Sequence, residues 1–374
     1  MKLISAWPLR VNRRTRTLRT RIHLAALFSL LCLLPSPSWA GDAVATASPA
    51  SASRAEASGP SVRGSQAAVR VPGPTGTDLQ TWLRRIGRAA KERSYSGTFI
   101  VQSGGRIVTS TIDHYVERGS MLERVETLDG ERRIMVCHND QTRTILPDAR
   151  LIVVEDLHAD FSFPRMLKAP HADVSAFYTM EREGHERCAG YVCDITRIKP
   201  NDDLRYGYRL WTEQGSGLLV KAQTLGAQGK VLDQVAFTQL NLNPKPRPNL
   251  VTQALRGTEG YQVEHMRASP TTAQAQGWTL VKPVPGFESV GTYQRQLVLR
   301  GKPVEVTQWL FSDGLASVSL FAGPTTDSQH QGASLHMGDT NALLDRKGNW
   351  SVIVVGAVPD KTLQLFADSL TRLH

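Results

Sequence analysis

The fold is decided by a stretch that reads LRYGYRLWTEQGSGLLVKAQTL, from Leu204 to Leu225. Large side chains alternate along its first half, with Tyr206, Tyr208 and Leu210 on one side and Arg205, Arg209 and Trp211 on the other. A period of two is typical of a β-strand, here with bulky rings on both faces. Gly215-Ser216-Gly217 then forms a turn signal before a second apolar run. The stretch therefore predicts two neighbouring antiparallel strands.

Similar short runs extend on both sides of this stretch. They fill the chain from Tyr95 to about Glu155 and again from Phe177 to Leu240, separated by turn signals such as Asp129-Gly130. Turns this short join antiparallel neighbours, so we expect about ten strands in a meander. Leu79, Leu83 and Ile86 recur at helical spacing before the first strand and predict an amphipathic helix. Together these elements predict a large curved sheet, in the form of an open barrel, with one or two helices.

A proline-rich segment follows, Asn243-Pro244-Lys245-Pro246-Arg247-Pro248. Prolines at alternate positions favour an extended linker, so we place a domain boundary here. Beyond it we expect a hairpin from Val304 to Phe321 that turns at Ser312-Asp313-Gly314. A final helix is predicted after Asp360, with an apolar stripe made of Leu363, Phe366, Leu370 and Leu373. The second domain is therefore a small α+β unit.

The N-terminal residues have the composition of a secretion signal. Seven basic and no acidic residues accompany the apolar run Leu24–Leu34, and Ser38-Trp39-Ala40 favours cleavage after Ala40. The run is short for a membrane span, which takes roughly 20 apolar residues. Residues up to about Thr75 are mostly small or Pro, typical of a disordered tether. The expected organisation is a signal peptide at 1–40, a linker at 41–76, a first domain at 77–242, a proline-rich linker at 243–250 and a second domain at 251–374.

Charge argues against nucleic acid as a partner. The formal net charge is +10, but removing the seven basic residues of the signal from the total of 44 leaves 37 against 34 acidic residues. The mature chain then carries only a slight positive excess, too small to attract a polyanion. We expect a soluble binding protein of the periplasm.

The sequence leaves open whether two of the cysteines form a disulfide. Cys188 and Cys193 flank Ala189-Gly190, so an oxidising compartment could bridge them across a tight hairpin. The spacing does not settle the connectivity, and plain strand thiols remain the alternative. Zinc held by His185 and the two thiols is less favoured, because a structural zinc site usually has four ligands. Cys137 is expected to be buried in a strand without a disulfide.

The chain has no recognisable catalytic motif. It contains no paired-His helix of the zinc peptidases, no nucleophile elbow, no P-loop and no dinucleotide-binding glycine pattern. We therefore expect no catalytic residues, no cofactor and no metal. An enzyme of unknown type remains the weaker reading.

Several stretches resemble one known family, the periplasmic regulators of the sigma-E stress response called RseB or MucB. They are YSGTFIVQSGG from Tyr95, LERVETLDGERR from Leu122, Leu146-Pro147-Asp148, LRYGYRLWTEQGSGLLVK from Leu204, Pro285-Gly286-Phe287 and FSDGLASVSLF from Phe311. The resemblance extends in order from about Leu79 to Leu373. The long Ala/Ser/Pro tether and the Cys188/Cys193 pair depart from the family pattern.

The resemblance implies an α+β protein. Its first domain would be a half-open antiparallel β-barrel with helices, similar to the lipoprotein carriers LolA and LolB, and its second a smaller α+β domain. It also implies binding to the periplasmic part of a membrane-spanning anti-sigma factor of the RseA/MucA type, which would be shielded from the site-1 protease. A lipid or lipopolysaccharide fragment would release that partner, and a homo-oligomer is left open. The alternative is a periplasmic lipid or lipoprotein carrier.

A ligand on such a sheet would contact apolar side chains on its uncovered surface. The residues expected to bind it are Phe99, Val101, Phe161, Phe163, Met166, Leu167, Tyr206, Tyr208 and Leu210. We expect Tyr208→Ala to weaken lipid-induced release more than it lowers stability.

Overall fold

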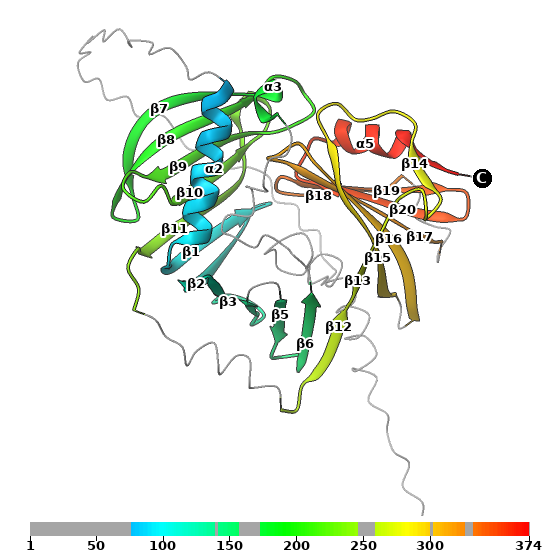
Figure 1. Cartoon of the computed structure of the whole chain (residues 1–374), viewed down its shortest axis with the longest axis horizontal. Helices are drawn as coiled ribbons and strands as arrows, with labels where there is room; N and C mark the ends of the chain where they lie inside the picture. Colours follow the sequence, from blue (N-terminus) through cyan, green and yellow to red (C-terminus); the bar gives the residue numbers. More distant parts are fainter. Residues whose placement is uncertain are drawn as a thin grey trace, which may run out of the picture.

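The protein is seen in a computed structural model that describes residues 76–138, 141–156, 173–245, 259–299, 302–325 and 332–373. These residues form sheets of twelve, seven and two strands (Figure 1). The order of the strands in each sheet is linear, so neither large sheet closes on itself. The structure is mostly β with few helices, which confirms the predicted open architecture. No helix of the described part is both long and apolar enough to cross a membrane.

The twelve-stranded sheet is the larger module. Its strands lie in the order β12-β6-β5-β4-β3-β2-β1-β11-β10-β9-β8-β7. Their bounds are β1 (Tyr95–Ser103), β2 (Arg106–Glu117), β3 (Ser120–Thr127), β4 (Ile134–His138), β5 (Gln141–Leu146), β6 (Leu151–Asp156), β7 (Tyr178–Cys188), β8 (Tyr191–Pro200), β9 (Gly207–Glu213), β10 (Leu219–Leu225), β11 (Val231–Asn241) and β12 (Gln262–Met266). Sequential neighbours are antiparallel, and the pairing of β1 with β11 joins the strands β1–β6 and β7–β11 into one open sheet.

The stretch that decides the fold forms the predicted antiparallel pair. β9 and β10 are joined through the Gly-Ser-Gly turn, where Glu213 accepts hydrogen bonds from the backbone amides of Gly215 and Ser216. The strand begins only at Gly207, so the segment 204–206 lies outside the sheet and is held by other contacts. That segment meets the second domain, as shown below.

A single long helix covers one face of this sheet (Figure 1). It is α2 (Gly76–Glu92), where the sequence predicts it, and Leu79, Leu83 and Ile86 are buried against the strands. Burial of each such side chain contributes about 1.5–3 kcal/mol, which explains why a helix with a basic outer face stays on the sheet. A short helix, α3 (Val174–Phe177), precedes β7 and begins with Asp173 as its N-cap.

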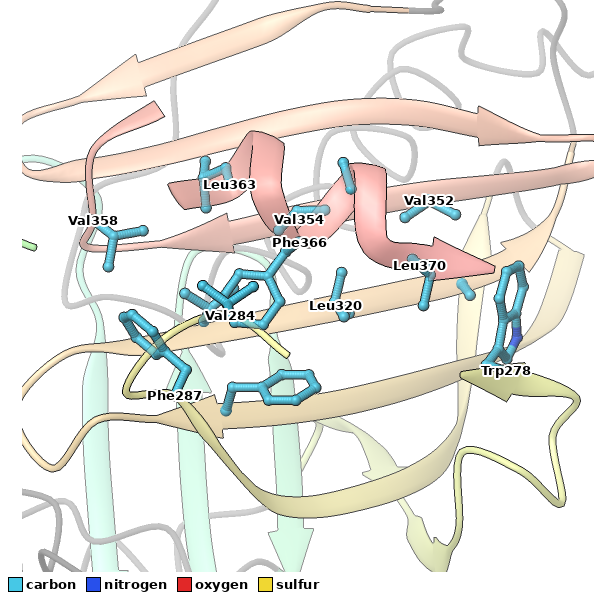
Figure 2. Packing of buried hydrophobic residues seen from close by; sticks show 14 of the residues in the cluster. Trp278, Val284, Phe287, Leu320, Val352, Val354, Val358, Leu363, Phe366 and Leu370 are labelled. Carbon is cyan, nitrogen blue, oxygen red and sulfur yellow. The ribbon is translucent and has the colours of Figure 1, made fainter. Parts of the chain in front are cut away.

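The seven-stranded sheet forms the second module, in the order β13-β15-β16-β17-β20-β19-β18. Its strands are β13 (Ala268–Thr271), β15 (Glu288–Leu299), β16 (Lys302–Ser312), β17 (Ser317–Pro324), β18 (Ser334–Met337), β19 (Thr340–Lys347) and β20 (Trp350–Gly356). The hairpin predicted through Ser312-Asp313-Gly314 is confirmed by the pairing of β16 with β17. Helix α5 (Asp360–Ser369) lies on this sheet, and Figure 2 shows Phe366 pointing from it toward Val284 and Leu320.

The predicted final helix ends earlier than its apolar stripe. Leu370 begins a short strand, β21 (Leu370–Arg372), that pairs with β14 (Trp278–Leu280). The Arg372 guanidinium stacks over the rings of Trp278 and Trp350, 5.0 and 4.2 Å from their centroids. Extending the helix through Leu373 was therefore wrong, because pairing with a distant strand overrides the local period.

One strand path connects the two large sheets. β12 pairs in parallel with β6 of the first sheet, and β13 pairs with β15 of the second. Only Arg267 separates β12 from β13. The chain thus passes from one sheet to the other within a single extended segment, and any relative movement of the two domains must bend it.

Candidate functional site

The ion pair with the least exposed side chains among the described residues lies where the two domains meet, and we call this region the domain interface. Arg205, from the segment before β9, lies at one end of it and its side chain has no exposed surface. Its Nη1 donates to Asp313 Oδ2 at 3.0 Å, its Nε to Asp202 Oδ1 at 3.0 Å, and its Nη2 to the carbonyl of Pro285 at 2.8 Å. One guanidinium therefore joins the first domain to two separate loops of the second.

Asp313, in the β16–β17 turn, is equally well partnered. Its Oδ1 accepts from the backbone amides of Leu315 (2.9 Å) and Ala316 (2.7 Å), and its Oδ2 accepts from the Tyr178 hydroxyl at 2.8 Å as well as from Arg205. Burial raises the pKa of the Asp313 carboxyl, against the opposing effect of these donors. Burial also raises the pKa of Tyr178 well above its ordinary value, which keeps its phenol a donor. We call Arg205, Asp313 and Tyr178 the clamp.

Aromatic rings enclose the clamp. The Arg205 guanidinium carbon lies 4.5 Å from the ring centroid of Phe177 and 5.2 Å from that of Phe287. Gly286 has a φ of +79°, and a Cβ there would meet Arg205 Nη1 at 2.8 Å and Phe177 at 2.9 Å. The Pro285-Gly286-Phe287 motif is therefore needed at this point for its backbone shape as well as for its ring.

The remainder of the segment before β9 is also held by the second domain. Thr362 Oγ1 donates to the carbonyl of Leu204 at 2.5 Å, and Asn341 Nδ2 donates to the Tyr206 hydroxyl at 3.0 Å. Lys361 forms an exposed ion pair with Asp203. Consecutive residues from 203 to 206 thus each touch the other domain, which explains why the strand does not begin until Gly207.

A second contact at the interface brings together two carboxyl groups, Asp233 on β11 and Asp339 in the β18–β19 turn. Thr224 Oγ1, on β10, donates to Asp339 Oδ2 at 2.8 Å. Burial, and next the charge of Asp339, raise the pKa of Asp233 to about 8. We call Asp233 and Asp339 the acid pair.

The third contact lies beside the connecting strand. Arg295 Nη1, on β15, is 3.7 Å from Glu155 Oε1, on β6, and both side chains are almost fully buried. Met266 and Ala268 are the residues opposite Glu155 and Arg295 in their ladders. Burial lowers the pKa of Arg295, and Glu155 opposes that shift. This ion pair spans the point where the chain changes sheets.

The predicted ligand-binding residues occupy different places. Phe99 and Val101 lie in a cluster with Phe237 at the centre of the first sheet, whereas Tyr208 and Leu210 lie in a second cluster under α2. Tyr206 reaches the domain interface. Phe161, Phe163, Met166 and Leu167 fall in residues 157–172, outside the described residues.

Strand registers nevertheless place four of these residues on one face. Phe99 and Val101 are opposite Phe237 and Val235 on β11, and the ladder continues through Ala222 to Leu210. Residues directly opposite in a ladder share a face. That face is the one α2 covers, and all four side chains are buried on it.

The two cysteines of the β7–β8 hairpin are not bridged in the structure. Cys188 is opposite Tyr191 and Cys193 is opposite Glu186, so the two are diagonal neighbours. Diagonal Cα atoms lie about 7–8 Å apart, beyond the usual range for a disulfide. The Cys188 thiol donates to Glu186 Oε1 at 3.7 Å, and burial is the main reason that the pKa of Cys193 rises to about 12. The disulfide is thus unformed here, and its formation on oxidation stays a prediction. Cys137 is buried in β4 without a disulfide, as expected.

Sequence analysis missed the clamp. It assigned Arg205 to a strand face and Asp313 to an ordinary hairpin turn, because their contact joins residues 108 positions apart. The available signal was the position of both residues inside the stretches that carry the family resemblance.

Comparison with known proteins agrees with this architecture. Residues 78–256 match the model of the MucB/RseB N-terminal domain, and residues 272–371 match that of the MucB/RseB C-terminal domain. The sigma factor AlgU regulatory protein MucB of Pseudomonas aeruginosa is 29% identical over 80% of this chain and 93% of its own length. The sigma-E factor regulatory protein RseB of Escherichia coli K12 is 22% identical over 77% of this chain and 89% of its own. Both are named as regulatory proteins and not as enzymes.

The fold has also been seen in crystals. The structure of MucB in complex with MucA(peri) superimposes with a TM-score of 0.61 at 26% identity and covers 79% of this chain and all of that one. MucB determined alone superimposes with a TM-score of 0.56 at 24% identity, covering 79% and 98% of the two chains. The chain therefore belongs to the MucB/RseB family.

Proposed function

We propose that this protein is a periplasmic negative regulator of a sigma-E-type envelope stress response. It binds the periplasmic part of a membrane-spanning anti-sigma factor of the RseA/MucA type and protects it from site-1 proteolysis. The observation that carries this proposal is the match, across both domains, to a MucB chain crystallised with MucA(peri). Residues 1–40 would direct export and 41–76 would form the tether between the cleavage site and the first domain.

A regulator of this kind needs two states that its partner and its signal prefer differently. The domain interface is the part of the described structure suited to that role. Its clamp, acid pair and strand connection are discrete contacts between two separately cored sheets. The partner would bind the docked arrangement, and a lipid or lipopolysaccharide fragment would bind a loosened one.

The lipid would use the face of the first sheet that carries Phe99, Val101, Tyr208 and Leu210. Because α2 and the second domain already bury that face, a guest has to displace one of them. Leu315 of the β16–β17 turn packs in the cluster under α2. A guest that enters there would therefore also displace the turn that carries Asp313 of the clamp. Binding and loosening would then be a single event.

The test is a pull-down from solubilised membranes of the source bacterium with the purified mature chain. We expect recovery of a single-span anti-sigma factor, its release by added lipopolysaccharide, and slower cleavage of its periplasmic segment by the site-1 protease. Recovery of no such protein, or equal cleavage with and without the chain, would refute the proposal. A lipid carrier would instead exchange cargo with membranes and retain no anti-sigma factor.

A further inference from the structure

Two carboxyl groups from different domains are pressed together in the acid pair. Asp233 lies opposite Ser103 in the β1–β11 ladder and opposite Thr224 in the β10–β11 ladder. Asp339 accepts hydrogen bonds from Thr224 at 2.8 Å and from Thr340 at 3.1 Å. The charge of Asp339 acts directly on the Asp233 carboxyl, whose Oδ1 is buried and has no hydrogen-bond partner among the described residues. A turn of the second domain thus places the Asp339 carboxyl beside the Asp233 carboxyl of β11.

The backbone around the pair is closely packed. Gly338, with a φ of +62°, precedes Asp339, and a Cβ at this position would overlap the Asp233 carboxyl and the Ser103 hydroxyl. Gly104, in the β1–β2 turn, packs on the same point, since its Cβ would lie 3.2 Å from Gly338 N. Two glycine turns therefore dock against each other, and this docking places Asp339 beside Asp233.

Neighbouring groups add little positive charge. From the first domain the pair is faced by Tyr206 and Tyr208, whose pKa values are raised mainly by burial, and by Arg106, which is opposite Ser103 but exposed. From the second domain, Asp360 also acts on Tyr206, and His336 lies 3.5 Å from Asp360. Both of those side chains are more than half exposed. Two carboxyl groups that are partly buried beside each other disfavour full ionisation, because a like charge and loss of water both oppose the charged form.

We infer that the acid pair is a proton-operated latch between the two domains, closed when Asp233 is protonated beside Asp339 and weakened when Asp233 is ionised. The direction in which pH changes the stability of docking follows from the linkage between proton binding and docking. The pKa of Asp233 is raised in the docked state, to about 8, whereas an undocked Asp has a pKa of about 3.9. The stabilisation is therefore complete below the undocked value and is lost as pH rises toward and through the docked value. Acid tightens the interface and alkali loosens it.

The experiment is hydrogen exchange on the purified chain, corrected for intrinsic rates, at about pH 6 and about pH 9, on either side of the docked pKa. We expect protection of the β18–β19 hairpin to fall about tenfold or more across this range. The β7–β8 hairpin, which is remote from the latch, should keep its protection. Asp339→Asn and Asp233→Asn should each flatten the pH dependence of the β18–β19 hairpin and keep it protected at the higher pH. Asp345→Asn, on the same hairpin but paired with Lys347, should keep the wild-type dependence.

Four results would overturn the latch. The first is wild-type protection that does not change with pH, and the second is a pH dependence that survives in both Asn variants. Loss of the dependence in His336→Gln would assign it to that histidine. Its disappearance when millimolar calcium is added would make the pair a cation site. Because none of these readouts involves the anti-sigma factor, failure of the latch is distinguishable from failure of the proposed function.

Discussion

The clamp and the acid pair join the same two domains, and each uses an aspartate from a turn of the second domain. In the clamp, Asp313 faces an arginine and a phenol, and each of its oxygens accepts two hydrogen bonds. In the acid pair, Asp339 faces another carboxyl group. A buried charge is tolerated when opposite charge and donors satisfy it, whereas a second carboxyl group beside it favours the protonated form. The clamp therefore fixes how the domains dock, while the acid pair makes the docking responsive.

The largest expected effect comes from removing the aspartate of the clamp. Asp313→Ala leaves the buried Arg205 with Asp202 as its remaining carboxylate, and it orphans the Tyr178 hydroxyl and two backbone amides. Loss of one partner of a buried pair costs about 3–5 kcal/mol of the free energy of unfolding. Urea unfolding measures it, and a loss below about 1 kcal/mol, as for a surface pair, would show that the clamp is not structural.

Gly286→Ala tests the loop that encloses the clamp. The added Cβ meets Arg205 and Phe177, and a non-glycine residue is strained at this positive φ, so we expect a loss of about 1–3 kcal/mol. Gly119→Ala is the matched control, because Gly119 has a similar φ of +80° but open space around it. The difference between the two variants in the free energy of unfolding measures the cost of the contact of the added Cβ with Arg205 and Phe177. Equal losses would mean that contact with Arg205 contributes nothing.

Tyr206→Phe removes the hydrogen bond that Asn341 donates to the Tyr206 hydroxyl across the domain interface. Asn341 keeps its bond to the Val358 carbonyl and loses the one to the phenol. We expect a decrease of about 0.5–1.5 kcal/mol in the free energy of unfolding. This residue is also a better probe of ligand release than Tyr208, because truncating a fully packed core ring destabilises the domain. A decrease as large as that of Asp313→Ala would contradict the division of the interface into separate contacts.

The smallest effect is expected for Asp203→Ala. Its ion pair with Lys361 crosses the same interface, but both side chains are exposed. Solvent screens such a pair, so the thermal midpoint should be unchanged within error. A clear fall in the midpoint would show that position at the interface matters more than burial.

The sequence predicted those parts of the fold that are determined by residues close together in the chain. The helical spacing of Leu79, Leu83 and Ile86 located α2, and the turn residues located the β9–β10 and β16–β17 hairpins. Contacts between distant residues were not predictable in this way. Leu370 leaves its helix to pair with Leu280, and Arg205 is buried only because Asp313 and the Pro285 loop arrive from the other domain.

The candidate site follows the same rule. Alternation in sequence correctly placed Tyr208 and Leu210 on one face, and strand registers join them to Phe99 and Val101. What covers that face depends on tertiary packing, which the period of a strand does not encode. The role of these residues in ligand binding stays a prediction.

We propose that docking of the two domains controls capture of the anti-sigma factor. The dissociation constant between the purified chain and the periplasmic segment of that factor tests this dependence, measured for the wild type and for Gly286→Ala, with Gly119→Ala as the folded control. We expect saturable binding by the wild type and the control, and binding at least about tenfold weaker when the clamp is strained, a difference of about 1.4 kcal/mol. Equal affinity of all three chains, or no binding by the wild type, would contradict it.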